Sequence, residues 1–141
     1  FSHFSKFILL YGYCYNFDFK KENFMNTPDC IFCKIIKKEI PSTIVFENEN
    51  FLVIETIEPK APIHYLILPK KHIVNLLSLE EEDTQIVLEI IKVAKKLAEN
   101  LEEPKAFNLI SNNGREAGQS VLHMHWHFLS GKNIYESEIK L

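Results

Sequence analysis

Histidines alternate with apolar residues in the run His123-Met124-His125-Trp126-His127-Phe128-Leu129. Successive side chains of a β-strand point to opposite faces, so an extended segment places the three imidazoles on one face, about 7 Å apart. The apolar side chains between them then point to the other face. Residues 123–129 therefore predict a strand with one chemical face and one face in the hydrophobic core.

Four further strands are predicted from runs of β-branched and aromatic residues. These runs are residues 43–47, 51–57, 64–68 and 107–111. The first two are separated by Asn48-Glu49-Asn50, which suits a hairpin connection. Prolines at positions 59, 62 and 69 bracket the third run and exclude a helix there.

Two helices complete the predicted pattern. Residues 30–38 carry isoleucines at helical spacing beside lysines, and Asp29 is the expected N-cap. Ser78 and Glu81 have the spacing of a capping box, and apolar residues recur at helical spacing over residues 86–101. Strands joined by tight turns and segregated from the helices indicate an α+β domain. We expect a mainly antiparallel five-stranded sheet with one long and one short helix.

Composition excludes several classes of protein. A chain of 141 residues has the usual size of one domain, and its formal charge of -3, with basic residues interleaved with glutamates, argues against nucleic-acid binding. No apolar run approaches the roughly 18 residues of a membrane span. Three cysteines, of which Cys30 and Cys33 lie close together, do not resemble a secreted disulfide framework. We therefore expect a cytoplasmic protein with neither nucleic-acid nor membrane partners.

The amino-terminal residues 1–24 differ from the rest, because they hold more than half of the aromatic residues in an irregular pattern. A polar lead-in, Asn26-Thr27-Pro28-Asp29, follows Met25. We expect residues 1–24 to be an extension outside the core, with an added strand or a partner-binding arm as alternatives. Residues 25–141 are expected to form the domain.

Three imidazoles on one face suit several kinds of chemistry: a metal site, a pH sensor, or a nucleophile with phosphate ligands. The loop at residues 114–120 favours the last, because it offers backbone amides, a hydroxyl and a carboxamide just before the histidines. Separately, Cys30 and Cys33 form a C-x-x-C pair, a spacing that lets two thiolates share a tetrahedral metal ion. A redox pair and ordinary core cysteines are the alternatives.

The run Gly118-Gln119-Ser120-Val121-Leu122-His123-Met124-His125-Trp126-His127 resembles the histidine triad (HIT) superfamily, specifically its nucleotide-binding, phosphoramidase-like branch. The resemblance extends from Cys30 to Gly131 and includes residues 59–64 and 69–72. It implies a reaction in two steps. His125 attacks the α-phosphorus of a nucleotide, and water later releases the nucleotidyl-histidine.

The same match implies roles for the neighbouring residues. His127 would bind phosphate oxygens, and Ser120 would assist the leaving group. Asn112 would lie against the phosphate or the ribose, and His64 would support the nucleophile from the adjacent strand, although an isolated histidine there is more often a core or edge residue. The expected nucleotide-binding residues are Ile31, Phe32, Ile35, Ile54, Thr56, Ile57, Gly118 and Gln119. Thr56 stands where relatives often carry an aspartate for the ribose hydroxyls.

Members of the superfamily that carry the C-x-x-C pair use two further histidines as ligands, which match His72 and His123. The resemblance thus implies a closed, structural zinc site of Cys30, Cys33, His72 and His123. His123 would then brace its strand through the metal while His125 and His127 face the substrate. Many relatives are homodimers that pair through the long helix and a sheet edge, so we expect a homodimer.

The resemblance implies hydrolysis of purine nucleoside phosphoramidates or of acyl or aminoacyl nucleotides. The lead-in Gly118-Gln119-Ser120 favours a phosphoramidase, because a hydroxyl can deliver a proton to a departing amine. Two alternatives stay open. One is dinucleoside polyphosphate hydrolysis or nucleotidyl transfer on the same histidine, and the other is a nucleotide-binding regulatory protein without catalysis.

Overall fold

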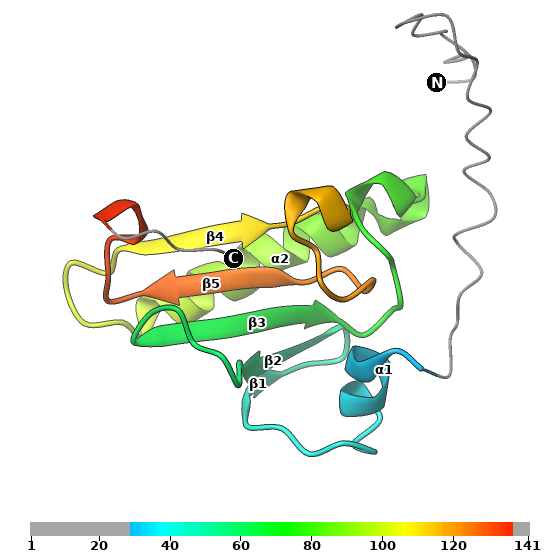
Figure 1. The fold of residues 1–141 in the computed structure, drawn as a ribbon, viewed down its shortest axis with the longest axis horizontal. Helices are drawn as coiled ribbons and strands as arrows, with labels where there is room; N and C mark the ends of the chain where they lie inside the picture. The colour runs from blue at the N-terminus through cyan, green and yellow to red at the C-terminus, as the bar shows by residue number, and fades with distance from the viewer. Residues whose placement is uncertain (1–28, 137–141) are drawn as a thin grey trace, which may run out of the picture.

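The structure, a computed structural model, describes residues 29–136 (Figure 1). Five strands form one antiparallel sheet in the order β1-β2-β3-β5-β4. Their bounds are Ile44–Glu47 (β1), Phe51–Glu55 (β2), Ile63–Pro69 (β3), Phe107–Ser111 (β4) and Trp126–Ser130 (β5). The long helix α2 (Thr84–Glu99) and the short helix α1 (Ile31–Ile36) complete the fold. The predicted α+β class is confirmed, whereas the prediction for residues 1–24 lies outside the described residues.

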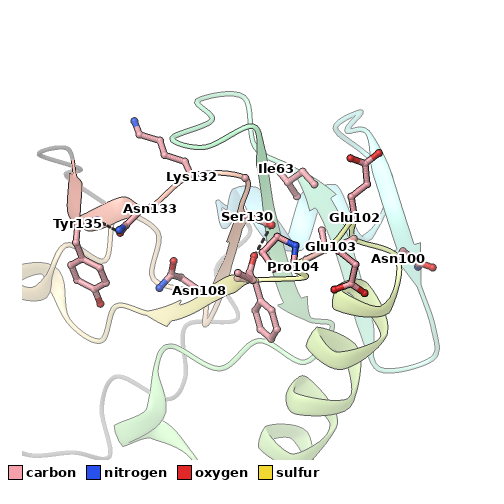
Figure 2. Close-up of a pocket in the computed structure, with 14 residues that line it drawn as sticks. Ile63, Asn100, Glu102, Glu103, Pro104, Asn108, Ser130, Lys132, Asn133 and Tyr135 are labelled. Atoms are coloured by element: carbon pink, nitrogen blue, oxygen red, sulfur yellow. Dashed lines mark hydrogen bonds between the residues drawn. The ribbon is translucent and has the colours of Figure 1, made fainter.

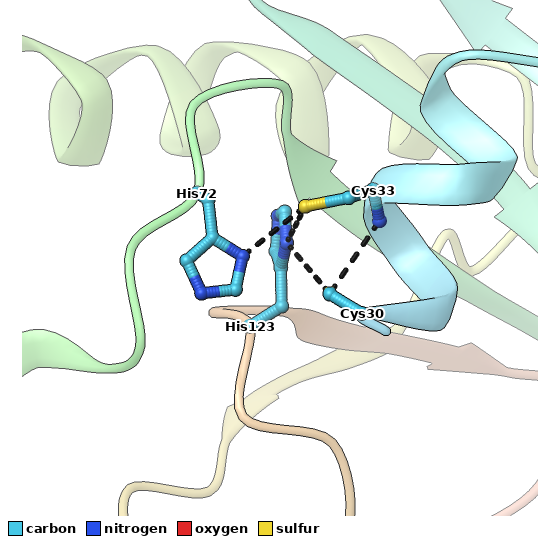
Figure 3. A group of neighbouring side chains, drawn as sticks. All are labelled: Cys30, Cys33, His72 and His123. Carbon is cyan, nitrogen blue, oxygen red and sulfur yellow. Dashed lines mark hydrogen bonds between the residues drawn. The ribbon is translucent and has the colours of Figure 1, made fainter. Parts of the chain in front are cut away.

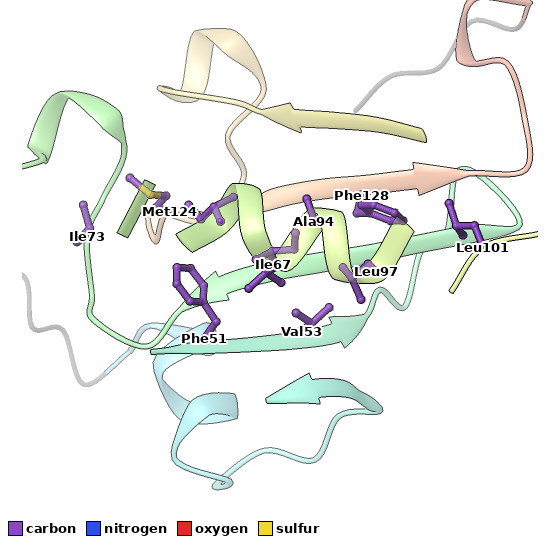
Figure 4. Packing of buried hydrophobic residues seen from close by; sticks show 11 residues of the cluster. Phe51, Val53, Ile67, Ile73, Ala94, Leu97, Leu101, Met124 and Phe128 are labelled. Atoms are coloured by element: carbon purple, nitrogen blue, oxygen red, sulfur yellow. The ribbon is translucent and has the colours of Figure 1, made fainter. Parts of the chain in front are cut away.

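The main core lies between α2 and one face of the sheet (Figures 1 and 4). The sheet contributes Phe51, Val53, Ile67 and Phe128 to this core, and α2 contributes Ile90, Val93, Ala94 and Leu97. Burial of each large apolar side chain stabilises the fold by about 1.5–3 kcal/mol. The helical spacing of these residues on α2 is the amphipathic pattern read from the sequence.

The opposite face of the sheet carries a second cluster, which holds α1 in place. Phe32 and Ile35 of α1 pack there with Cys30 and with the buried side chains of Leu52, Ile54, Leu66 and Leu68. On the same face, His127 of β5 lies opposite Leu66 of β3 and Ile110 of β4. The short helix is therefore packed onto the face that carries the histidines.

The start of β5 differs from the prediction in a way that matters for the site. The strand begins at Trp126, and residues 123–125 are not part of the ladder. The backbone N–H of Met124 instead donates to the carbonyl of Ile73, at 2.6 Å, in the segment after β3. The predicted single strand of three imidazoles is thus wrong: His127 belongs to the strand, and His123 and His125 lie on the segment that leads into it.

Both helices begin later than the sequence suggested. The N-cap of α1 is Cys30 and not Asp29, and its Sγ accepts from the backbone N–H of Cys33 at 3.5 Å. The capping box before α2 joins Glu80 and Asp83 rather than Ser78 and Glu81. The 3-10 turn Glu81–Asp83 occupies the predicted first turn of the helix, and another 3-10 turn, Leu76–Ser78, precedes it. No helix between residues 29 and 136 has both the length and the apolar character needed to cross a membrane.

Candidate active site and metal centre

Four potential metal ligands converge where α1 meets the ends of two loops (Figure 3). Cys30 and Cys33 come from the amino end of α1, His72 from the segment after β3, and His123 from the segment before β5. Their ligand atoms all lie within 4.8 Å of one another. The Sγ atom of Cys33 is 3.2 Å from Nδ1 of His72 and 3.5 Å from Nδ1 of His123, which is also 3.5 Å from Sγ of Cys30.

These distances fit a tetrahedral zinc ion. Zinc–sulfur bonds of about 2.3 Å and zinc–nitrogen bonds of about 2.0–2.1 Å give a sulfur–nitrogen edge of roughly 3.5 Å. The tautomer of His123 also fits, because its Nε2–H donates to the carbonyl of Pro69 at 2.8 Å and leaves the Nδ1 lone pair facing the thiols. Burial lowers the pKa of His123 to about 4, so the ring is in the neutral form that binds metals. The cluster can therefore hold a metal ion with all four positions filled by protein.

Without a metal, the thiol of Cys33 would resist ionisation. Burial, followed by the hydrogen bond and charge interaction with Cys30, raises the pKa of Cys33 to about 11. A bound divalent cation reverses this preference by stabilising the thiolates directly. The donor set is thus one whose ligand form is stabilised by the metal itself.

His125 is oriented by a single backbone group. Its Nδ1–H donates to the carbonyl of His123 at 2.8 Å, so in the neutral ring the lone pair lies on Nε2. The ring is 5% exposed. It packs edge-to-face against Phe32, with ring centroids 5.1 Å apart, and beside His127 at 5.2 Å. Burial lowers the pKa of His125, so Nε2 carries a free lone pair at neutral pH.

His127 receives its orientation through His64. The backbone N–H of Lys60 donates to Nδ1 of His64 at 3.0 Å, which places the His64 proton on Nε2. That Nε2–H donates to Nδ1 of His127 at 2.9 Å, so the proton of neutral His127 lies on its own Nε2. Burial, and then the charges of His125 and His64, lower the pKa of His127 to about 4. His64 thus supports His127 directly, and its predicted support of His125 runs through His127.

The loop between β4 and the histidines is tightly closed on itself. Gly114 and Gly118 have φ angles of 95° and 90°, in a region of backbone conformation that residues other than glycine rarely adopt. Asn112 donates from Nδ2 to the carbonyl of Ala117 at 2.7 Å, and its buried Oδ1 has no partner among the described residues. Ser120 is exposed at the end of the loop.

Gln119 was predicted to contact the nucleotide, and its side chain is instead bound to the backbone. It is 2% exposed, with Oε1 accepting from Gly114 and Nε2 donating to the carbonyls of Val74 and Val121. Its own backbone N–H also donates within the loop, to Gly114. The structure therefore places the carboxamide inside the loop.

The predicted apolar cleft is divided between core and surface. Phe32, Ile35 and Ile54 are buried together, whereas Ile31 is 45% exposed and Ile57 is 97% exposed beyond the end of β2. The half-buried Thr56 follows β2, and its hydroxyl accepts from the backbone N–H of Glu58 at 3.4 Å.

A cavity of about 130 Å³ beside α1 is lined by Ile35 and by Lys38, Ile40, Pro41, Ser42 and Ile44. Ile40 was assigned no role from the sequence, and its backbone N–H donates to the carbonyl of Lys34 in α1 at 3.4 Å, which keeps it next to that helix.

A larger cavity of about 870 Å³ lies away from the histidines, where the carboxyl end of α2 meets the ends of the sheet (Figure 2). Asn100, Glu102, Asn108, Lys132 and Tyr135 are among its lining residues. It contains none of the predicted site residues. Its lining comes from several separate turns with no shared motif, so the sequence carried no signal for it.

The comparisons with known proteins agree with this fold and this histidine cluster. The family model described as HIT domain matches residues 37–134, so the chain belongs to the HIT domain family. A HIT family hydrolase from Clostridium thermocellum is 47% identical, with a TM-score of 0.72 over 76% of this chain and 94% of that chain. A HIT family hydrolase from Legionella pneumophila is 42% identical, with a TM-score of 0.70 over 75% of this chain and 96% of that chain.

A third solved structure bears on the metal cluster. It is a zinc-bound histidine triad family protein from Mycobacterium smegmatis, 32% identical to this chain. Its TM-score is 0.66, and the match covers 74% of this chain and 76% of that protein.

Proposed function

We propose that this protein is a hydrolase of the nucleotide-binding, phosphoramidase-like branch of the family. It would act at the α-phosphorus of purine nucleoside phosphoramidates or of acyl or aminoacyl nucleotides. The observation that carries the proposal is the hydrogen bond from Nδ1 of His125 to the carbonyl of His123, at 2.8 Å. This bond fixes the tautomer with a free Nε2 lone pair, the form required of a nucleophile. The similarity to HIT family hydrolases supports the same class of reaction.

In the first step, Nε2 of His125 forms a bond to phosphorus as the bond from phosphorus to the leaving amine breaks. The departing nitrogen takes up a proton, for which the exposed hydroxyl of Ser120 is the donor in our proposal. The substituted imidazole is then positively charged. The carbonyl of His123 stabilises this charge, because a hydrogen bond from a charged donor is stronger than one from a neutral donor.

In the second step, water attacks phosphorus and gives one proton back to the Ser120 oxygen as the bond from phosphorus to Nε2 breaks, which returns both Ser120 and His125 to their neutral forms. In both steps the Nε2–H of His127, oriented by His64, donates to a non-bridging phosphate oxygen. A zinc ion held by Cys30, Cys33, His72 and His123 would supply structural rigidity and no open coordination position.

The test uses an adenosine phosphoramidate labelled at the α-phosphorus, with wild type and His125→Ala compared. Wild type should release AMP, and acid-free quenching should trap label on the protein; His125→Ala should do neither. Equal rates for the two proteins would end the nucleophile assignment. Faster turnover of a diadenosine polyphosphate would favour the dinucleotide hydrolase, and AMP binding without turnover of either substrate would favour the regulatory role.

We also infer that the protein is a homodimer. Leu88 and Ile91 are 55% and 54% exposed on the face of α2 that points away from the core, and β4 is an edge strand of the sheet. Apolar helix faces and free strand edges are surfaces that proteins commonly cover. Light scattering should give twice the chain mass, and Leu88→Glu should give the mass of a single chain.

A further inference from the structure

Gln119 is a buried side chain whose hydrogen-bonding groups are taken by the protein backbone. Its Oε1 accepts from the N–H of Gly114 at 2.8 Å. Its Nε2 donates to the carbonyl of Val74 at 2.6 Å and to that of Val121 at 3.1 Å. Both N–H bonds of the carboxamide are therefore used, and no donor remains for a phosphate oxygen.

These bonds join the loop before the histidines to the segment after β3. Gly114 and Val121 lie at the two ends of the loop, and Val74 lies two residues beyond His72. Two other contacts connect the same segments: Met124 donates from its backbone to Ile73 at 2.6 Å, and Leu76 donates to Oδ1 of Asn113 at 2.9 Å. The loop is thus attached to residues 73–76 near both of its ends.

The attachment bears directly on the reacting groups. Ser120 is the next residue after Gln119, and Val121 lies two residues before His123, whose carbonyl orients His125. A shift of the loop would therefore displace both the hydroxyl and the nucleophile. Displacements of about 1 Å at a reacting centre can lower a rate about 100-fold.

We propose that Gln119 is a positioning residue for the reaction, which holds Ser120 and the segment leading to His125 in place and does not contact the nucleotide. This inference rests on the proposed function. Loss of the carboxamide leaves the carbonyl of Val74, the carbonyl of Val121 and the N–H of Gly114 without their partner. The loop must then rearrange to find water or other partners, because unpaired buried polar groups are costly.

The test compares Gln119→Met, which fills similar space without hydrogen bonds, with Gln119→Glu, whose carboxylate can accept from Gly114 but cannot donate. Both variants should lower kcat about 10- to 100-fold and change KM less than about threefold, because substrate contacts persist while alignment is lost. Ser130→Ala is the matched control. It removes another largely buried hydrogen bond, from Ser130 to the carbonyl of Ala106, at the far end of β5, and should leave kcat unchanged.

A second readout does not need substrate. Hydrogen exchange of the substrate-free protein should be faster at residues 114–124 in both Gln119 variants and unchanged there in Ser130→Ala. Unchanged exchange with wild-type kcat would overturn the proposal, and so would a KM raised tenfold at constant kcat, which would indicate direct substrate contact. If Gln119→Met does not fold, Gln119→Glu decides the result. If wild type and His125→Ala are equally active, the proposed function fails, while the exchange comparison still reports on the attachment.

Discussion

His123 and His125 lie two residues apart in one motif and have opposite tautomers. His123 donates from Nε2 to Pro69 and turns its Nδ1 lone pair toward the cysteines. His125 donates from Nδ1 to the carbonyl of His123 and keeps the lone pair on Nε2. The lone pair thus lies on the nitrogen that faces the cysteines in His123, and on the nitrogen that we propose as the nucleophile in His125. The backbone carbonyl that each ring contacts, and not the spacing of the histidines alone, therefore decides which ring nitrogen keeps its lone pair.

Removing each ring in turn should separate the two roles. His125→Ala should lower kcat by about 1,000-fold or more, because the nucleophile is lost, and should leave the metal content unchanged. His123→Ala should lose the metal but retain more activity than His125→Ala per folded molecule, since the carbonyl that orients His125 belongs to the backbone. Steady-state rates and metal analysis of both variants provide the measurement. Similar activity losses with similar metal contents would contradict the division.

Metal removal should affect stability more than chemistry. The four ligands join α1 to the segment after β3 and to the segment before β5, so chelation should lower the midpoint of thermal unfolding by about 10–20 °C, the effect of a few kcal/mol in a domain of this size. The kcat of the protein that remains folded at low temperature should fall less than about tenfold. Calorimetry with and without chelator, with Cys33→Ser as the matched variant, tests this. If the purified protein contains no zinc, and if the chelator leaves the midpoint of thermal unfolding unchanged, the four residues do not form a metal site.

The sequence predicted the elements better than it predicted their ends. The strand at Phe107–Ser111 was placed with the right bounds, because its β-branched and aromatic residues lie between polar loops. The start of β5 could not be predicted, since it depends on a hydrogen bond from Met124 to the distant Ile73. Local spacing also suggested Ser78 and Glu81 as a capping box, whereas the capping box in the structure joins Glu80 to Asp83, whose buried side chain also pairs with the distant Lys71.

The site shows the same limit. The sequence and the resemblance named four potential metal ligands, Cys30, Cys33, His72 and His123, which the structure brings together. They could not reveal that the carboxamide of Gln119 binds Val74, because that contact depends on how the loop folds onto a segment far away in the chain. They also grouped Ile57 with Ile54, although the strand ends at Glu55 and leaves Ile57 exposed.

The contact between His64 and His127 gives a smaller effect on catalysis. His64→Phe removes the donor to Nδ1 of His127, so the Nε2–H tautomer of His127 is no longer enforced, and kcat should fall about tenfold. His64→Gln is the matched control, because an amide N–H can replace the lost donor and should restore part of the rate. Equal loss in both variants would mean that the size of the ring, and not its proton, is what matters at position 64.

The smallest expected effect is the pH dependence of stability contributed by His127. Burial lowers its pKa to about 4 in the folded protein, below the ordinary value of 6.5, and the neighbouring His125 and His64 act in the same direction. Between these two pH values the unfolded chain binds more protons at this position than the folded one. The free energy of unfolding therefore rises with pH from about 4 to 6.5, and this stability is lost as the pH falls through that range.

Denaturant unfolding at several pH values should give His127→Gln a shallower pH slope than wild type, by at most about 1.4 kcal/mol per pH unit for one proton. Because His127 accepts a hydrogen bond from His64, the difference between the two slopes reports on this pair of rings, and parallel curves would show that the His127 ring titrates normally in the folded state.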